Sequence, residues 1–184
     1  NAYWCCMWDK ISVNLQKFKL KTDNQIECLE YLKKNNDKNS IILICGPPKT
    51  GKSSIGFIHA QELQEDGFSV YITNDYSPTN LGVLSGFQTL YSTFEDKCNS
   101  EKKRLIVMID EVDTHLDNIE FNHFKEHNEY KREVSNKSEW NKWIDDLHSY
   151  RYKNITFILT TNKSEEYFNG KPIFGEGIDS SYLR

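Results

Sequence analysis

Four runs of consecutive apolar residues recur along the chain from residue 41 onward. They are Ile41 to Cys45, Ser69 to Thr73, Leu105 to Ile109 and Ile155 to Leu159. A continuous apolar run without alternation is typical of a strand that helices bury on both faces in a parallel sheet. The segments between the runs are long enough for crossover helices. The pattern therefore predicts an α/β fold with a mostly parallel central sheet between layers of helices.

Two of the intervening segments carry apolar side chains at helical spacing. One stripe consists of Leu84, Phe87, Tyr91 and Phe94, and the other of Trp140, Trp143, Ile144 and Leu147. We expect these side chains to pack on the sheet rather than to stack on a ligand. Residues 114–139 are instead dense in charged and amide side chains, and we expect an exposed insertion or mobile loop. His123 and His127 within it lack the glutamate that a zinc-protease motif requires, so we expect exposed histidines.

A different pattern precedes the first apolar run. Alternating apolar residues between Ile11 and Leu15 predict a strand that packs on one face. Thr22 or Asp23 is a suitable N-cap for a following helix, whose apolar positions continue to Leu32. The first 40 residues therefore predict one strand and one helix.

Composition restricts the class of protein. The 184 residues are enough for one compact domain, and 38% hydrophobic residues are typical of a folded chain. The net charge of -4 gives no overall attraction to nucleic acid. Five cysteines without a CxxC pair indicate neither a disulfide framework nor a zinc site, and favour an intracellular location, cytoplasmic or nuclear. No apolar stretch approaches the ~20 residues that span a bilayer, and the richness in Asn and Lys allows for a viral origin.

The segment after the first apolar run matches the phosphate-loop pattern G-x-x-x-x-G-K-[ST]. It lies between a predicted buried strand and a helix that begins near Lys52, which is the context that this loop requires. Backbone N–H groups of the loop and the helix N-terminus attract phosphate. Lys52 adds a positive charge for the β and γ phosphates, and Ser53 offers a hydroxyl to Mg²⁺. We expect the nucleotide to be bound by Gly46, Pro47, Pro48, Lys49, Thr50, Gly51, Lys52, Ser53 and Ser54.

Polar side chains that suit phosphate hydrolysis follow two of the other apolar runs. Asp110 and Glu111 come at the carboxyl end of a predicted strand, where open α/β sheets bind ligands. We expect Asp110, with Ser53, to hold Mg²⁺, and Glu111 to orient and polarise the water that attacks the γ-phosphate of ATP. Asn162 closes the fourth run, so we expect its amide to reach the γ-phosphate or the attacking water.

Four motifs occur in order along the chain and carry a family resemblance. They are GPPKTGKS at 46–53, IDEVD at 109–113, TTN at 160–162 and GIDSSYLR at 177–184. Together they resemble the AAA+ ATPases, and especially their AAA branch. The resemblance implies a P-loop NTPase core, which is a three-layer αβα sandwich. We accordingly divide the chain into a flanking segment, residues 1–40, and a core, residues 41–184, that stops before the family's last strand and helical lid, as part of a longer polypeptide.

By the same resemblance, Asn162 corresponds to the family's sensor-1 residue. Arg184 corresponds to the first arginine of the arginine-finger segment, which acts on ATP bound to a neighbouring subunit. The resemblance thus implies a ring-shaped homo-oligomer, such as a hexamer, in which Mg²⁺-dependent ATP hydrolysis remodels a protein or nucleic-acid partner. Its catalytic residues would be Glu111, Asn162 and Arg184.

The chain departs from the family's pattern at two places. Lys49 stands where the family usually has glycine, which reduces backbone freedom but adds positive charge near the phosphates. The segment from Tyr76 to Gly86 lies where the family has its first pore loop, yet it contains no clear aromatic-glycine pair. The sequence therefore predicts ATP binding but not the threading of a substrate through a pore.

Two other functions stay open at this point. Residues 110–113 also satisfy the D-E-x-D pattern of helicases, but the spacing from Lys52 is short, and Thr-Thr-Asn replaces the Ser-Ala-Thr segment of the DEAD-box class. The other alternative is an ATP-dependent binding or scaffold module with low turnover. Glu111 argues against it, because a pure binder does not need an acid that polarises water.

Overall fold

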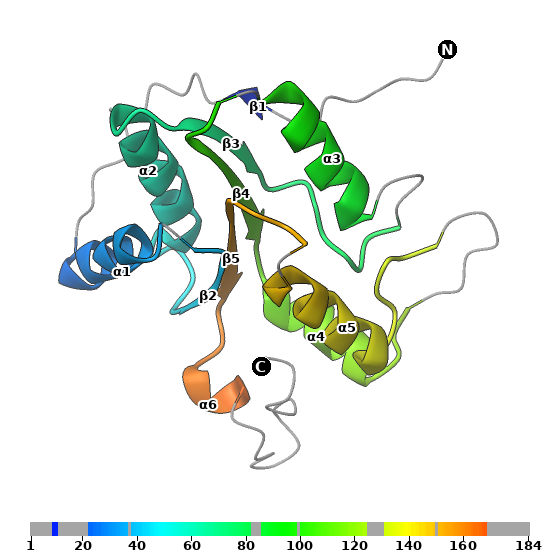
Figure 1. The fold of residues 1–184 in the computed structure, drawn as a ribbon. Coiled ribbons are helices and arrows are strands. Elements are labelled where there is room, and N and C mark those ends of the chain that lie inside the picture. Colours follow the sequence, from blue (N-terminus) through cyan, green and yellow to red (C-terminus); the bar gives the residue numbers. More distant parts are fainter. Residues whose placement is uncertain are drawn as a thin grey trace.

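The chain is described by a computed structural model over residues 9–10, 22–36, 38–81, 86–98, 100–124, 131–149 and 151–168. Strands and helices alternate through most of this length (Figure 1). Their bounds are β1 Asp9–Lys10, α1 Asp23–Lys34, β2 Ser40–Cys45, α2 Lys52–Glu65, β3 Ser69–Thr73, α3 Phe87–Lys97, β4 Lys103–Ile109, α4 Val112–Glu120, α5 Lys137–His148, β5 Ile155–Thr161 and α6 Glu165–Phe168.

The strands form one sheet in the order β1-β3-β4-β5-β2. β3, β4, β5 and β2 are parallel to one another, and β1 pairs with β3 in the antiparallel direction. All four apolar runs are thus strands of a parallel sheet, as the sequence predicts. Since parallel strands share one direction, the segments after β2, β4 and β5 meet at the same edge.

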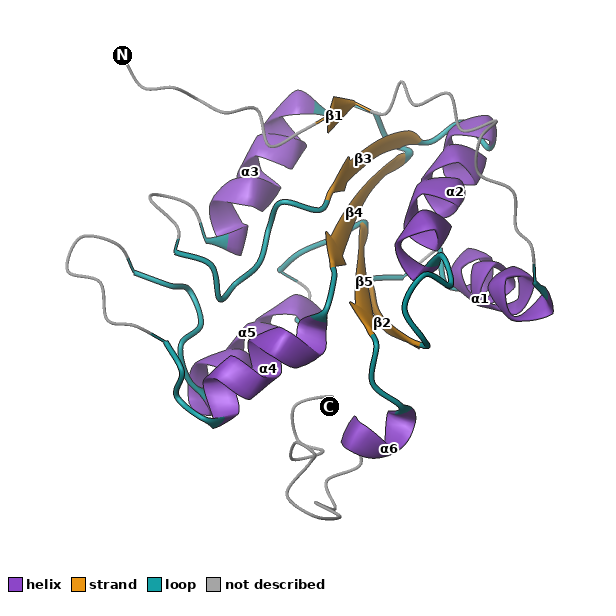
Figure 2. Ribbon diagram, turned by 180° about the vertical axis from the view of Figure 1, so that it is seen from behind, coloured by secondary structure: helices purple, strands orange, loops and turns teal. Residues whose placement is uncertain are grey.

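Helices cover both faces of the sheet, which gives the expected three layers (Figures 1 and 2). α1 and α2 lie on one face, and α3, α4 and α5 lie on the other. Side chains of β4 alternate between the two cores: Ile106 and Met108 pack with the α2 residues, whereas Leu105, Val107 and Ile109 pack with residues of α3, α4 and α5. The predicted fold class is confirmed.

The aromatic stripes of α3 and α5 form the larger of the two cores. Phe87 is 1% exposed, and its ring lies 4.9 Å from that of Tyr152 and 5.1 Å from that of Phe157 on β5. Trp140 is 0% exposed and Trp143 is 5% exposed. The prediction that these rings pack on the sheet is confirmed for the described residues, among which Leu84 is not included.

α1 begins where the sequence places its cap. The Thr22 hydroxyl accepts a hydrogen bond from the backbone N–H of Gln25, and the Gln25 side chain accepts one from the N–H of Thr22. This reciprocal pair of hydrogen bonds is a capping box at the start of α1. The strand predicted between Ile11 and Leu15 lies outside the described residues.

The prediction of an exposed or mobile segment over residues 114–139 is wrong for much of that range. α4 occupies Val112–Glu120, and its Leu116 and Ile119 are buried. Val134 is also buried, and its N–H donates to the Pro78 carbonyl at 2.9 Å. The charged residues that dominate the sequence here alternate with apolar positions at helical spacing, which is enough to bury one side of a helix.

Candidate functional site

The phosphate loop joins β2 to α2 and contains two residues with positive φ. Gly51 has φ 79° and Lys49 has φ 65°. Glycine adopts this left-handed region freely, whereas a residue with a Cβ does so at a cost of roughly 1–2 kcal/mol. The Thr50 hydroxyl donates to the Pro47 carbonyl at 2.8 Å, and Gln25 on α1 donates to the Thr50 carbonyl at 2.6 Å. These hydrogen bonds hold the loop in its bent shape.

The amino end of α2 is open to an anion. Its N-cap, Gly51, provides no side-chain hydrogen bond, and the first turn carries no acidic residue. The first N–H groups of a helix have no partner within the helix, and the helix dipole adds positive potential there. The start of α2 therefore suits a phosphate group.

Lys52, the first residue of α2, makes three hydrogen bonds at this end of the sheet. Its Nζ donates to the carbonyls of Gly46 and Pro47 at 2.9 Å each, and to Oδ1 of Asn162 at 2.9 Å. The ammonium thus lies between the phosphate loop and the end of β5. A phosphate oxygen can replace any of these neutral acceptors and form a stronger, charge-assisted hydrogen bond.

Asp110, directly after β4, faces the first turn of α2. Its Oδ1 accepts hydrogen bonds from the Ser53 hydroxyl at 2.8 Å and from the Thr160 hydroxyl at 2.7 Å. A carboxylate beside a serine hydroxyl is a set of hard oxygen donors, which is the ligand type that Mg²⁺ prefers. The residues present therefore fit a magnesium ion, with Ser53 and Asp110 as the groups that would hold it.

Glu111 has φ 52°, an uncommon conformation for a residue that is not glycine. Such strain costs about 1–3 kcal/mol and is often found at functional sites. The side chain is exposed, and its Oε1 accepts a hydrogen bond from Nδ2 of Asn162 at 3.4 Å. Asn162 therefore bridges Lys52 and Glu111, because its two amide atoms bond one residue each.

Three positioning contacts were missed by sequence reasoning. Besides the Gln25 bond to the loop, Thr160 donates to Asp110, and Thr161 donates to Asp113 at 2.6 Å. Thr161 and Asp113 are 0% and 8% exposed. The available signal was a pair of threonines at the end of a run that is otherwise apolar, since buried hydroxyls need a hydrogen-bond partner.

The predicted site residues of the described chain lie at one edge of the sheet. The phosphate loop, Asp110, Glu111 and Asn162 are joined there by the hydrogen bonds given above. Ser54 is half-buried in the first turn of α2, and Pro48 is exposed in the loop. Arg184 lies outside the described residues.

Neither a transition-metal site nor a membrane helix is found in the described part of the chain. His123 is exposed and stacks on Phe121 with ring centroids 5.7 Å apart, while His127 lies outside the described residues. No group of three His, Cys, Asp or Glu side chains among the described residues could hold a metal ion. Within the same residues, no helix has the length and apolar character to cross a membrane.

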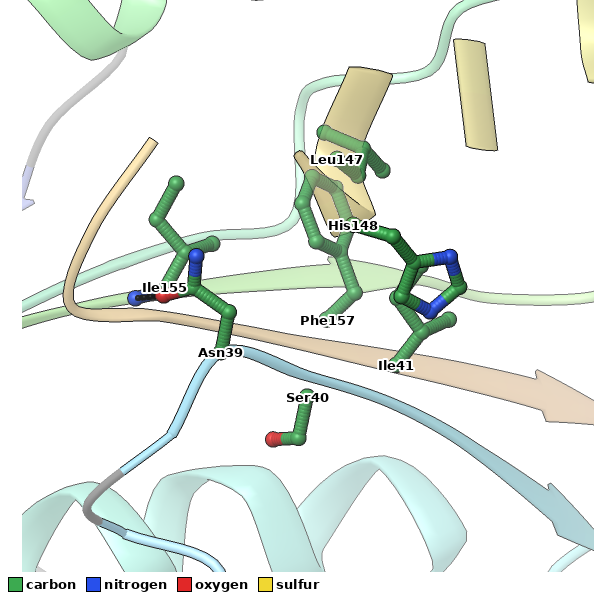
Figure 3. Close-up of a pocket in the computed structure, with 7 residues that line it drawn as sticks. All are labelled: Asn39, Ser40, Ile41, Leu147, His148, Ile155 and Phe157. Carbon is green, nitrogen blue, oxygen red and sulfur yellow. Dashed lines mark hydrogen bonds between the residues drawn. The ribbon is translucent and has the colours of Figure 1, made fainter. Parts of the chain in front are cut away.

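A small hollow lies at the opposite end of the sheet (Figure 3). Its lining includes Asn39, Ile41 and Phe157, and Asn39 accepts a hydrogen bond from the N–H of Ile155 at 3.2 Å. The space inside it is about 10 Å³, which is room for about one water molecule and far below the ~300 Å³ of the smallest typical ligand sites. It lies at the amino ends of β2 and β5, so the length of those strands separates it from the phosphate loop.

Two solved structures have chains similar to this one. A chain in the structure of C. elegans PCH-2 is 20% identical, with a TM-score of 0.47, over 79% of this chain and 39% of that chain. A chain in the structure of the E. coli MS115-1 HORMA:CdnC:Trip13 complex is 13% identical, with a TM-score of 0.44, over 76% of this chain and 50% of that chain. This chain thus spans half or less of the length of either. Among curated proteins, none matches its sequence.

The sequence also matches a family model over residues 42–169, and the model is that of the ATPase family associated with various cellular activities (AAA). The match covers more than half of the chain and includes the phosphate loop, Asp110, Glu111 and Asn162. All of these lie at the carboxyl edge of the parallel sheet. The chain therefore belongs to the AAA family of ATPases.

Proposed function

We propose that this chain binds and hydrolyses ATP with Mg²⁺, and that hydrolysis drives the remodelling of a partner by an oligomeric ring. The observation that carries the proposal is the convergence of Lys52, Ser53, Asp110, Glu111 and Asn162 at one edge of the sheet. They come from three separate parts of the chain. Their side chains supply a cation, oxygen ligands, an acid and an amide, which are the groups that phosphoryl transfer to water requires.

The β and γ phosphates would be bound by the phosphate loop and the start of α2. Lys52 would exchange hydrogen bonds to neutral acceptors for bonds to phosphate oxygens, which carry negative charge. Because the loop already has its bent conformation, with Thr50 bonded to Pro47, little ordering of this segment accompanies binding. Preorganisation of this kind favours affinity.

Ser53 and Asp110 would hold the magnesium ion. The Ser53 hydroxyl has one proton and two lone pairs, so it can keep its hydrogen bond to Asp110 and still offer an oxygen to a cation. A bound magnesium ion would offset the charge that develops on the phosphate oxygens.

Glu111 would act on the attacking water. Its carboxylate is exposed and can accept a proton as the water oxygen bonds to the γ-phosphorus and the bond from that phosphorus to the ADP oxygen breaks. Asn162 lies between Glu111 and Lys52, where its amide can orient the water or the γ-phosphate. The products are ADP and inorganic phosphate.

The oligomeric part of the proposal follows from the family. Arg184, as the arginine-finger counterpart, would reach ATP on a neighbouring subunit and stabilise the negative charge of its transition state. Hydrolysis would then depend on contact between subunits. The division into residues 1–40 and 41–184 stays a prediction, as does the nature of the partner.

The test is the rate of phosphate release without an added acceptor, measured over a range of protein concentrations. Lys52→Ala should weaken ATP binding, and Glu111→Gln should retain binding but lose at least about 100-fold in turnover, since general-base catalysis contributes 10²–10⁴-fold. Glu101→Gln is the matched control, because this exposed glutamate precedes the opposite end of β4. A specific rate that rises steeply with concentration supports a ring.

Four outcomes would contradict the proposal or part of it. Normal turnover by Glu111→Gln would remove its catalytic role, and unchanged ATP affinity of Lys52→Ala would remove the nucleotide site. Binding without any turnover would instead favour the scaffold function. Stimulation of the rate by nucleic acid would favour a helicase.

A further inference from the structure

Thr160 is a buried threonine at the carboxyl end of β5, an inner strand of the sheet. It is 2% exposed, and its hydroxyl donates to Oδ1 of Asp110 at 2.7 Å. The same oxygen accepts the Ser53 hydroxyl at 2.8 Å. Two hydroxyls from different elements therefore converge on one carboxylate oxygen.

The sheet register explains why Thr160 reaches this acid. β5 lies between β4 and β2, and Ile109 of β4 is registered with Leu159 of β5. One position further along each strand, Asp110 and Thr160 are neighbours. Ile158 packs in the core beside α2, so Thr160, two residues later, points to the same face as Ser53.

The adjacent threonine has a different partner. Thr161 points to the opposite face of the sheet and donates to Asp113 at 2.6 Å, near the start of α4. Asp113 also has a buried position. Only Thr160 of the two threonines therefore contacts the proposed Mg²⁺ carboxylate.

We propose that Thr160 is a positioning residue that fixes the orientation of the Asp110 carboxylate for Mg²⁺ binding. The Thr160 hydroxyl donates to Oδ1 of Asp110. Among the described residues, Oδ2 of Asp110 accepts no hydrogen bond, so this second oxygen is available to the ion or its water shell. Hydrogen bonds from outer-shell groups fix the direction of metal-ligating side chains and raise metal affinity. This inference rests on the proposed Mg²⁺-ATP site.

The experiment compares Thr160→Val, which keeps the side-chain shape but removes the hydroxyl, with Thr160→Ser, which keeps the hydroxyl. Thr156→Val is the matched control, because Thr156 is also 2% exposed and points to the same face of β5, four residues from Thr160. The readout is the binding of a fluorescent ATP analogue, first in EDTA and then with increasing Mg²⁺. Thermal unfolding is recorded for every variant.

In EDTA, we expect all variants to bind the analogue as the wild type does. The Mg²⁺ concentration that gives half of its effect on analogue binding should rise about tenfold for Thr160→Val. A tenfold change is about the lower end of the usual loss of metal affinity when an outer-shell contact is removed. It should stay near the wild-type value for Thr160→Ser and Thr156→Val. A merely structural role of Thr160 would lower the unfolding temperature without changing this concentration.

A Thr160→Val variant with the wild-type Mg²⁺ dependence would overturn the inference while leaving the proposed function intact. Failure of the proposed function is distinguishable, because the wild type itself would then show no effect of Mg²⁺ on analogue binding. If Thr160→Val does not fold, Thr160→Ala makes the same comparison against Thr160→Ser. In that pair, equal Mg²⁺ dependence would again refute the positioning role.

Discussion

The side-chain oxygen of Asn162 accepts a hydrogen bond from the Lys52 ammonium at 2.9 Å, although 110 positions separate the two residues in the sequence. The contact exists because β2 and β5 are neighbours in the sheet, so the segments that follow them begin side by side. Nδ2 of the same amide donates to Glu111. Asn162 therefore connects the residue proposed to bind phosphate with the residue proposed to activate water.

Asn162→Ala should reduce turnover far more than nucleotide binding. Lys52 retains the Gly46 and Pro47 carbonyls in this variant, so the phosphate loop keeps its shape and ATP affinity should change little. Turnover should fall about 100-fold, as expected for the loss of one positioned donor beside the reacting phosphate. Phosphate release and nucleotide titration check the two quantities, with Asn141→Ala on α5 as control. An equal loss in turnover and in ATP affinity would show that Asn162 acts in binding only.

Lys49→Gly should stabilise the fold. Lys49 has φ 65°, which strains a residue with a Cβ but not glycine. The greater freedom of glycine in the unfolded chain offsets part of this gain. We expect a net gain of about 0.5–1 kcal/mol in the free energy of unfolding, measured by urea denaturation. Lys49→Ala retains a Cβ and should show no such gain. An equal gain for alanine would mean that loss of the lysine charge is responsible.

Glu133→Ala should destabilise the junction of α3 with residues 131–134. The Glu133 carboxylate accepts the Phe87 N–H at 2.9 and 3.0 Å and the Tyr76 hydroxyl at 2.5 Å. It thereby replaces the side-chain cap that Gly86 cannot provide. Burial, reinforced by this carboxylate, raises the pKa of Tyr76 well above its usual value. Loss of a helix cap predicts about 1–2 kcal/mol of destabilisation in urea denaturation.

Gly86→Ala tests the same junction from the other side. A Cβ at Gly86 would lie 2.9 Å from Oε1 of Glu133, so alanine should displace the carboxylate. Because both variants remove one interaction, the double variant with Glu133→Ala should lose less stability than the two single losses added together. Full additivity would show that the two residues act independently.

His59 should make the fold less stable in mild acid. It is 0% exposed, and neither ring nitrogen has a hydrogen-bond partner among the described residues. Burial, with the nearby positive charges of Arg104 and Lys33, lowers the pKa of His59 to about 4. The unfolded chain, with a pKa near 6.5, binds this proton more readily than the folded one. The neutral His59 ring therefore makes its full contribution to the free energy of unfolding above about pH 6.5. This contribution is lost as the pH falls toward about 4.

Urea denaturation at pH 7, 6 and 5 measures this effect. We expect the wild type to lose about 2 kcal/mol between pH 7 and pH 5 through His59. Over the same pH range, His59→Leu should lose about 2 kcal/mol less unfolding free energy than the wild type. His148→Gln changes an exposed histidine and should follow the wild type. Parallel pH dependence of the wild type and His59→Leu would contradict the prediction.

Much of the site was predictable because its parts are local in sequence. An apolar strand, a glycine-containing loop and a helix start lie within a few residues of one another around Lys52, and their geometry follows from backbone preferences. Asp110 and Glu111 likewise follow directly from the strand that carries them. α4 was missed because its polar and charged residues together outnumber Val112, Leu116 and Ile119, although those three recur at helical spacing.

The sequence by itself determined which residues the sheet edge offers: a lysine, a serine, two acids and an amide, each at the end of a strand or the start of a helix. Only the tertiary structure decided which of them touch. β5 follows both β2 and β4 in the sequence but lies between them in the sheet, and this order brings Asn162 to Lys52 and Thr160 to Asp110. Strand order depends on contacts between distant segments, where packing of whole faces outweighs local preference, so no short pattern in the sequence carries it.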